Sequence, residues 1–295
     1  MTDEQDRSSE RRGIVVGIDA SAGSDAALRW AIAAATSERP ARPVFAWQYP
    51  YTVWVPAGVG GAPAPSADQM QAEAERAAEE IHAGVERTHS EDPGVTRGDP
   101  GVVRVDQAPD PALQAVGTRG HGAMASRLIG SVSRYCTDNA SSPVAVIPGD
   151  TDLTTPRTIV VGVDGSDNGD AALEWAVRFA APDDTIRAIN AWNFIVGVAY
   201  SRPPLDPVKV AAASREVVED VADRVCAAAG VEPTRVAREI VDGDPRKVLH
   251  DLQDEADLVV VGARGRTGLA HLVRGSTASS LVHRPSCPIV VVPHP

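Results

Sequence analysis

The sequence of 295 residues has few cysteines, and their placement argues against a disulfide framework or a zinc site. Cys136, Cys226 and Cys287 are far apart and odd in number, so each is best interpreted as a small buried apolar residue in a reduced protein. No apolar run is long enough to span a bilayer, and the polar start MTDEQDRSSERR has no apolar signal-peptide core. We therefore expect a cytoplasmic protein.

Positive charge is also scarce, because 28 Lys and Arg face 40 Asp and Glu, which gives a net charge of −12. Nucleic acids and anionic membranes need a positive surface, so neither is expected as a partner. Lysine occurs only at Lys209 and Lys247, and neither follows a glycine, which excludes a P-loop. The first strand-to-helix turns lack the dinucleotide fingerprint, so a Rossmann dehydrogenase is disfavoured as well.

The sequence contains an internal repeat. The stretch GIVVGIDASAGSDAALRWA (13–31) returns 145 residues later as TIVVGVDGSDNGDAALEWA (158–176), and the same offset joins Gly98-Asp99-Pro100 to Gly243-Asp244-Pro245. One register held over a whole unit indicates a duplicated domain. We predict a flexible tail over 1–12, domain one over 13–148, a linker over 149–157 and domain two over 158–295.

Each copy alternates apolar strands with amphipathic helices. In copy two this pattern predicts strands and helices in the order βαβαβαβαβ, which implies a parallel sheet with helices on both faces. The expected strands are 159–164, 188–192, 235–241, 257–262 and 288–293, and the expected helices cover 166–180, a segment beginning at Asp206-Pro207, 245–256 and 276–284.

Copy one is less regular than copy two. Its third strand, 90–97, contains Pro93 and Gly94, which are tolerated best at a sheet edge. Pro109 and Pro111 should shorten the next helix, and Gln114 stands in the fourth strand where copy two has a valine. Because a buried amide needs hydrogen-bond partners, we expect copy one to be the less stable copy.

A frame of glycines follows the fourth strand in both copies. GTRGHGAMASRLIGS (117–131) and GARGRTGLAHLVRGS (262–276) share the spacing Gly-x2-Gly-x9-Gly-Ser. In open parallel sheets, ligands bind beyond the carboxyl ends of strands, at the point where the strand order reverses. If strands one and four flank that point, the frame meets the aspartate that ends strand one. The alternative is a purely structural role, in which the glycines form turns and the serines cap helices. Because the whole frame occurs twice, we favour the ligand site.

These residues suit a bound phosphate. The Gly-Ser pair opens the last helix, whose free N–H groups and positive dipole end favour an anion. Arg119 and Arg264 could pair with phosphate or remain solvated, and His121, whose counterpart is an arginine, would play a basic role. Asp19 and Asp164 could hold a ribose hydroxyl or a phosphate-bound Mg²⁺.

Both copies resemble the universal stress protein family, and the chain is similar to a tandem member of its ATP-binding branch. The resemblance rests on VVGIDAS and VVGVDGS, GDP in each copy, VGTRGHG and VGARGRTG, the Gly-Ser pairs, and the closing PVAVIP and PIVVVP. It implies two tandem doubly wound α/β domains, each a five-stranded parallel sheet with helices on both faces, that bind ATP with or without Mg²⁺.

The resemblance also implies a set of nucleotide contacts. These contacts come from four places: the end of strand one, the end of strand two (toward adenine), the glycine frame and the start of the last helix. The full set is Gly17, Ile18, Asp19, Ala46, Gly117, Arg119, Gly120, Gly130, Ser131, Val132 and Ser133 in copy one, and Gly162, Val163, Asp164, Ala191, Gly262, Arg264, Gly265, Gly275, Ser276, Thr277 and Ala278 in copy two.

Three functions stay open at this point. The first is an ATP-loaded regulator, to which the family resemblance adds a role in stress survival or growth control. The second is a slow ATPase or phosphotransferase, although no base is evident beyond the aspartates. The third is an interaction scaffold that binds another adenine nucleotide. Its apolar closing strands VAVIP and IVVVP could pair as sheet edges, either in a homodimer or between the two copies of one chain.

Overall fold

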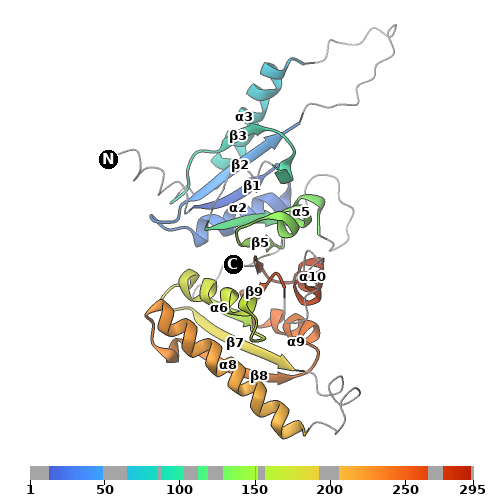
Figure 1. The fold of residues 1–295 in the computed structure, drawn as a ribbon. Coiled ribbons are helices and arrows are strands. Elements are labelled where there is room, and N and C mark those ends of the chain that lie inside the picture. Colours follow the sequence, from blue (N-terminus) through green and yellow to red (C-terminus); the bar gives the residue numbers. More distant parts are fainter. Residues whose placement is uncertain are drawn as a thin grey trace.

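The computed structural model describes residues 13–48, 65–85, 88–102, 112–118, 129–149, 151, 157–192, 206–264 and 275–293 (Figure 1). Strands and helices alternate in both copies, as the apolar runs and amphipathic segments predict. Copy one contains β1 (Ile14–Ile18), α2 (Ala22–Ala34), β2 (Ala41–Trp47), α3 (Ala67–Ala83), β3 (Gly94–Arg97), β4 (Leu113–Gly117), α5 (Ser131–Asn139) and β5 (Val144–Ile147).

Copy two repeats this order, and its second helix and third strand are longer than those of copy one. The N-cap at Asp206 and the proline at the first helical position are confirmed, since the Asp206 carboxylate accepts the backbone N–H of Val208 at 3.0 Å. The elements are β6 (Thr158–Gly162), α6 (Asp167–Phe179), β7 (Thr185–Trp192), α8 (Pro207–Ala229), β8 (Val236–Asp242), α9 (Pro245–Asp251), β9 (Leu258–Gly262), α10 (Ser276–His283) and β10 (Ile289–Val292), with short 3-10 turns at Pro233–Arg235 and Leu252–Asp254.

The strands of both copies form one sheet in the order β3-β2-β1-β4-β5-β10-β9-β6-β7-β8. Within each copy all strand pairs are parallel, and the chain reverses its direction of travel across the sheet between β1 and β4 and between β6 and β9. These are the doubly wound arrangements that the sequence predicts. The third strands, β3 and β8, lie at the two edges of the sheet, as expected.

The two copies join through their closing strands. β5 and β10 pair antiparallel, with Val146 opposite Ile289 and Val144 opposite Val291. Each of these strands also pairs with the fourth strand of its own copy, so both of its edges are already hydrogen-bonded. Of the two pairings that the sequence left open, a homodimer or a pairing between the copies of one chain, the structure shows the second. It leaves neither closing strand an edge for a second chain.

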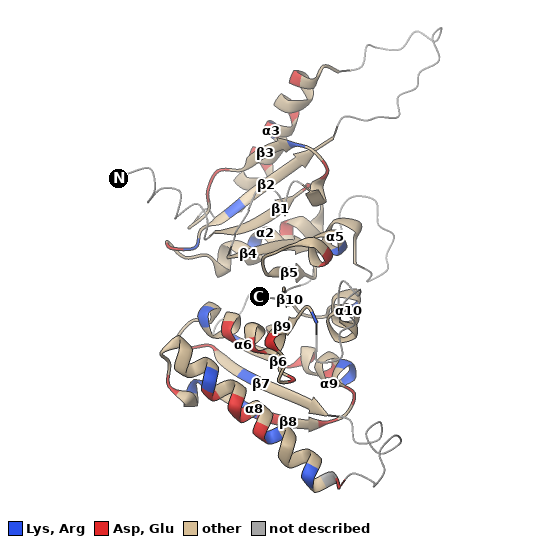
Figure 2. Cartoon of the chain, in the orientation of Figure 1, with Lys and Arg blue, Asp and Glu red and all other residues tan. Residues whose placement is uncertain are grey.

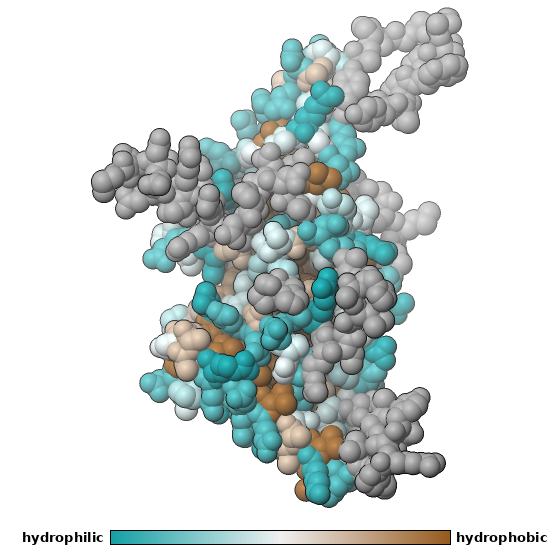
Figure 3. Space-filling model, viewed as in Figure 1, coloured by the Kyte–Doolittle hydropathy of each residue, from teal (hydrophilic) through white to brown (hydrophobic). Residues whose placement is uncertain are grey.

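Helices cover both faces of the sheet, because the strands are apolar on both sides. One face packs against α2, α3, α6 and α8 in a continuous cluster that crosses the joint. The other face packs against α5, α9 and α10. The outer surface is largely hydrophilic in the view of Figure 3, and charges of both signs are interspersed along α8 (Figure 2). All three cysteines are buried thiols that form no disulfide, as predicted.

An aromatic cluster fastens the helices of the two copies together. Phe179 of α6 stacks on Trp175 at 4.6 Å and on Trp30 of α2 at 6.1 Å between ring centroids. The guanidinium of Arg39 lies 4.5 Å from the centre of the Phe179 ring, and the Trp175 indole donates to the carbonyl of Ala112 at 3.4 Å. Copy one thus contacts copy two through side chains as well as through the sheet.

The irregular part of copy one differs from copy two as expected. β3 begins only at Gly94, directly after Pro93, and has four residues where β8 has seven. Gln114 is buried in β4, where its amide nitrogen donates to the Ser142 hydroxyl at 3.0 Å while its Oε1 has no partner. The helix end near Pro109 and Pro111 lies outside the described residues. No helix in the described part of the chain is long and apolar enough to cross a membrane.

Candidate functional site

Two candidate sites lie where the first and fourth strands of each copy end side by side. β1 pairs with β4 and β6 pairs with β9, so the expectation that strands one and four flank the crevice is confirmed. Gly17, Ile18 and Asp19 therefore end beside Gly117, and Gly162, Val163 and Asp164 end beside Gly262. Because the strands are parallel, these residues meet at the carboxyl ends of the strands in each half-sheet.

The first glycine of each frame has a packing role that the sequence did not reveal. A Cβ atom on Gly117 would lie 2.3 Å from the carbonyl oxygen of Gly23, in the first turn of α2. A Cβ atom on Gly262 would lie 2.6 Å from the carbonyl oxygen of Asn168, in the first turn of α6. These glycines therefore let the start of a helix approach the end of the fourth strand closely.

The last helix of each copy begins beside the carboxyl end of the fourth strand. The N–H of Gly130 donates to the carbonyl of Thr118 at 2.7 Å, and the N–H of Gly275 donates to the carbonyl of Ala263 at 2.6 Å. These bonds close the base of the loop that each glycine frame forms. Both helices have a glycine N-cap and no side-chain capping bond, and the serine that follows is exposed. Each helix thus presents a first turn of N–H groups suited to an anion.

The remaining predicted residues of the helix starts divide into two kinds. Val132 and Thr277 are partly exposed. Ser133 and Ala278 are buried, and the Ser133 hydroxyl donates to the carbonyl of Gly117 at 2.5 Å. The Ser133 side chain is therefore engaged within the protein, and its backbone N–H is the group that remains suited to a ligand contact.

The two aspartates are held by different hydrogen bonds. Asp19 Oδ1 accepts the N–H of Ser21 at 3.0 Å. Asp164 Oδ1 accepts both the N–H of Ser166 at 3.1 Å and the Ser166 hydroxyl at 2.5 Å. A carboxylate has about four lone-pair sites, so both can accept further bonds from a ribose hydroxyl or approach a phosphate-bound Mg²⁺. Among the described residues, no three His, Cys, Asp or Glu side chains gather as metal ligands.

The turn that follows each aspartate needs a left-handed residue. Gly165 has φ of 75°, and its counterpart Ala20 has φ of 61°. A Cβ atom makes this conformation costly, so copy one carries strain here that copy two avoids. The sequence offered a signal for this difference, because Gly165 aligns with an alanine.

The second strand ends beside the first in both copies. Ala46 and Ala191 are partly exposed there, one residue from the end of β2 and β7. Asn190 precedes Ala191 and is buried, and its Nδ2 donates to the carbonyl oxygen of Val163 at 2.9 Å. Sequence reasoning missed this contact, although an asparagine inside the apolar strand AINAW was a visible signal.

Two parts of the predicted site need separate mention. Arg119, Gly120, His121 and Gly265 lie outside the described residues. Arg264 is described, and it lines a pocket between the copies together with Asp138 and Ala140 from the end of α5.

The Gly-Asp-Pro motif of each copy caps a helix. Asp99 Oδ1 accepts the N–H of Gly101 at 2.9 Å, and Asp244 Oδ1 accepts the N–H of Arg246 at 2.9 Å. Hydrogen bonds from the Arg246 side chain lower the pKa of Asp244 to about 2. The aspartate of this motif is thus a charged N-cap that begins a helix beside the second and third strands.

Known proteins match the chain over nearly all of its length. A family model described as "Universal stress protein family" matches residues 10–148 and again 155–293. Universal stress protein Rv2005c of Mycobacterium tuberculosis is 30% identical over 293 residues, which cover 96% of this chain and 97% of that protein.

Solved structures match as well. The crystal structure of a universal stress protein from Archaeoglobus fulgidus covers 97% of this chain and 99% of its own, with a TM-score of 0.63 and 20% identity. Another match is a universal stress protein in complex with cAMP, 24% identical over 47% of this chain, with a TM-score of 0.37.

Proposed function

The chain belongs to the universal stress protein family, and we propose that it is a regulator that binds one adenine nucleotide in each copy. ATP, with or without Mg²⁺, is the proposed ligand, and stress survival or growth control in the cytoplasm is the proposed setting. The observation that carries the proposal is the pair of uncapped helix starts, Gly130-Ser131 and Gly275-Ser276, which end their loops beside the carboxyl ends of strands one and four.

The site supplies a contact for each part of a nucleotide. The N–H groups of the first helical turn would bind phosphate, which the dipole end of the helix favours. Asp19 and Asp164 would accept ribose hydroxyls or approach the metal. Ala46 and Ala191, at the ends of the second strands, would contact the base. When bound, Mg²⁺ would neutralise phosphate charge; one protein carboxylate per site suffices for that, because Mg²⁺ keeps several waters.

Binding rather than turnover is the proposed role. The Asp164 carboxylate already accepts two hydrogen bonds from Ser166, which hold it against its own turn, and no other side chain in the described part of either site is placed to act as a base. A ligand that binds only the folded protein raises its stability by mass action, which gives the regulator two states of different stability.

The test is to denature freshly purified protein and to identify and count the nucleotide that is released. We expect adenine nucleotide, up to two per chain. The matched control is the double variant Ser131→Asp/Ser276→Asp, whose two sites are exposed. An aspartate in the first turn stabilises a helix but repels phosphate, so the variant should fold well and release none. Equal release from both proteins, or no release and no shift of the melting temperature with added ATP, would refute the proposal.

The enzymatic alternative needs its own measurement. Turnover of labelled ATP by the parent protein is compared with turnover by the same double variant. Turnover above that control would make the protein a slow ATPase, whereas bound but unhydrolysed ATP is the result that we expect of a regulator.

A further inference from the structure

We propose that Asn190 is a positioning residue that fixes the base-binding wall of the second site. The inference rests on the proposed function and adds to it a residue that neither the glycine frame nor the family motifs include. Its basis is the hydrogen bond from Asn190 Nδ2 to the carbonyl oxygen of Val163, which joins the end of β7 to the end of β6.

The hydrogen bond lies where backbone pairing stops. The parallel register of β6 and β7 ends at the pair Gly162 and Ile189, and the N–H of Val163 still donates to the carbonyl of Ile189 at 2.9 Å. The next contact across the two strands is made by the Asn190 side chain. The backbone bond to Ile189 and the side-chain bond from Asn190 together hold both polar backbone groups of Val163, the residue that precedes Asp164.

Copy one solves the same problem without an amide. The register of β1 and β2 extends one residue further, to the pair Ile18 and Phe45, which are the counterparts of Val163 and Asn190. Phe45 packs against the apolar core. The equivalent position thus has a polar link in copy two and an apolar contact in copy one, which provides an internal control.

The consequence concerns one part of the ligand only. Asn190 lies between Ala191, proposed to contact the base, and Val163, which leads into Asp164. Loss of the amide would leave a buried carbonyl without this donor and would loosen the two segments that face the nucleoside. The start of α10, proposed to bind phosphate, is held by a different hydrogen bond, from the N–H of Gly275 to the carbonyl of Ala263. The geometry of this helix start should therefore not change.

The experiment separates nucleoside from phosphate binding by calorimetry on the full chain. Ser131→Asp first disables site one, and Asn190→Leu is then added. We expect the affinity for ATP to fall about tenfold, which is the effect of losing roughly one buried hydrogen bond. The affinity for tripolyphosphate should stay within about twofold of the parent value. The control is Phe45→Leu in a Ser276→Asp background, where ATP binding to site one should stay within about twofold.

Each result decides a different question. If the Ser131→Asp parent binds no ATP at site two, the proposed function fails there and this inference fails with it. If the parent binds ATP and Asn190→Leu binds it equally, or loses ATP and tripolyphosphate together, only the positioning role is overturned. Asn190→Asp keeps the shape and guards against a folding failure: the charged carboxylate cannot donate to Val163, so its ATP affinity relative to the parent should recover as falling pH protonates it. An unchanged ratio of affinities across pH would also overturn the role.

Discussion

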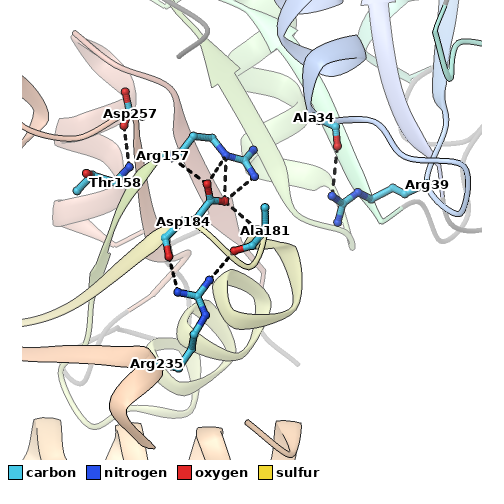
Figure 4. A network of polar contacts seen from close by, with 8 residues as sticks. All are labelled: Ala34, Arg39, Arg157, Thr158, Ala181, Asp184, Arg235 and Asp257. Atoms are coloured by element: carbon cyan, nitrogen blue, oxygen red, sulfur yellow. Dashed lines mark hydrogen bonds and ion pairs between the residues drawn. The ribbon is translucent and has the colours of Figure 1, made fainter. Parts of the chain in front are cut away.

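Arg157 and Asp184 form an ion pair with 2.7 Å between Nη2 and Oδ2, and the Asp184 side chain is only 1% exposed. The same carboxylate accepts the backbone N–H groups of Arg157 and Ala181, each at 2.8 Å, while Arg235 donates to the carbonyl oxygens of Asp184 and Ala181 (Figure 4). Arg157 directly precedes β6, so this buried carboxylate anchors the chain where it enters copy two.

Asp184→Asn should lower the free energy of unfolding by about 3 kcal/mol, because it leaves the half-buried Arg157 without its counter-charge. Urea unfolding monitored by circular dichroism measures the change. Glu174→Gln is the control, since Glu174 pairs with Arg178 on the exposed surface and should change stability by less than about 1 kcal/mol. A loss at Asp184 no larger than this control would contradict the anchoring role.

The same carboxylate should make stability depend on pH. Burial alone would raise the pKa of Asp184, but hydrogen bonds from Arg157 and Ala181 outweigh it and hold the pKa below its usual value. A lowered native pKa stabilises the fold above the unfolded pKa of about 4, and that stabilisation is lost as the pH falls through the native value. The difference between parent and Asp184→Asn should therefore be constant from pH 7 to pH 5 and shrink below about 4. A difference that persists at lower pH would refute this account.

The sequence predicts the order of elements, the sheet edges and the meeting of strands one and four, because buried parallel strands appear as apolar runs and the repeat checks each assignment. It does not predict the roles of Gly117, Asp184 or Asn190. These depend on contacts with residues distant in sequence, such as Gly23 against Gly117, and no local pattern encodes the approach. The ligand roles of the frame remain predictions.

Ala20→Gly should raise the free energy of unfolding by about 0.5 kcal/mol, because relief of the left-handed strain at Ala20 exceeds the added chain entropy of glycine. Gly165→Ala should lower it by at least about 1 kcal/mol, since a Cβ atom there would also lie 3.0 Å from Val217. Thermal unfolding of the two variants side by side tests this. Changes of the same sign would show that the two turns are not equivalent.

Gly117→Ala should lower the free energy of unfolding by about 2 kcal/mol or more, because the new Cβ atom collides with the backbone of Gly23 rather than with a movable side chain. Gly149→Ala is the control, since no atom of the described residues other than its chain neighbours lies within 4 Å of its Cβ position. Chemical denaturation compares the two. If both variants are as stable as the parent, the close approach of α2 to β4 is not required by the fold.

Gln114→Val with Ser142→Cys should stabilise copy one by about 1 kcal/mol, because it removes a buried amide whose Oε1 has no partner. The two new residues are those of copy two, Val259 and Cys287. Ser142→Ala alone should destabilise the protein, since the amide then also loses its acceptor. A double-mutant cycle in urea measures both effects, and a double variant weaker than the parent would refute the reasoning.

The antiparallel pairing of β5 with β10 determines whether the two copies stay associated when the protein is scarce. Because β5 and β10 run antiparallel, the carboxyl ends of the strands of copy one lie at the opposite end of the sheet from those of copy two. Because a single polypeptide supplies both partners, their association is intramolecular and dilution does not separate them. The pairing of the two half-sheets is thus independent of how many molecules a cell makes.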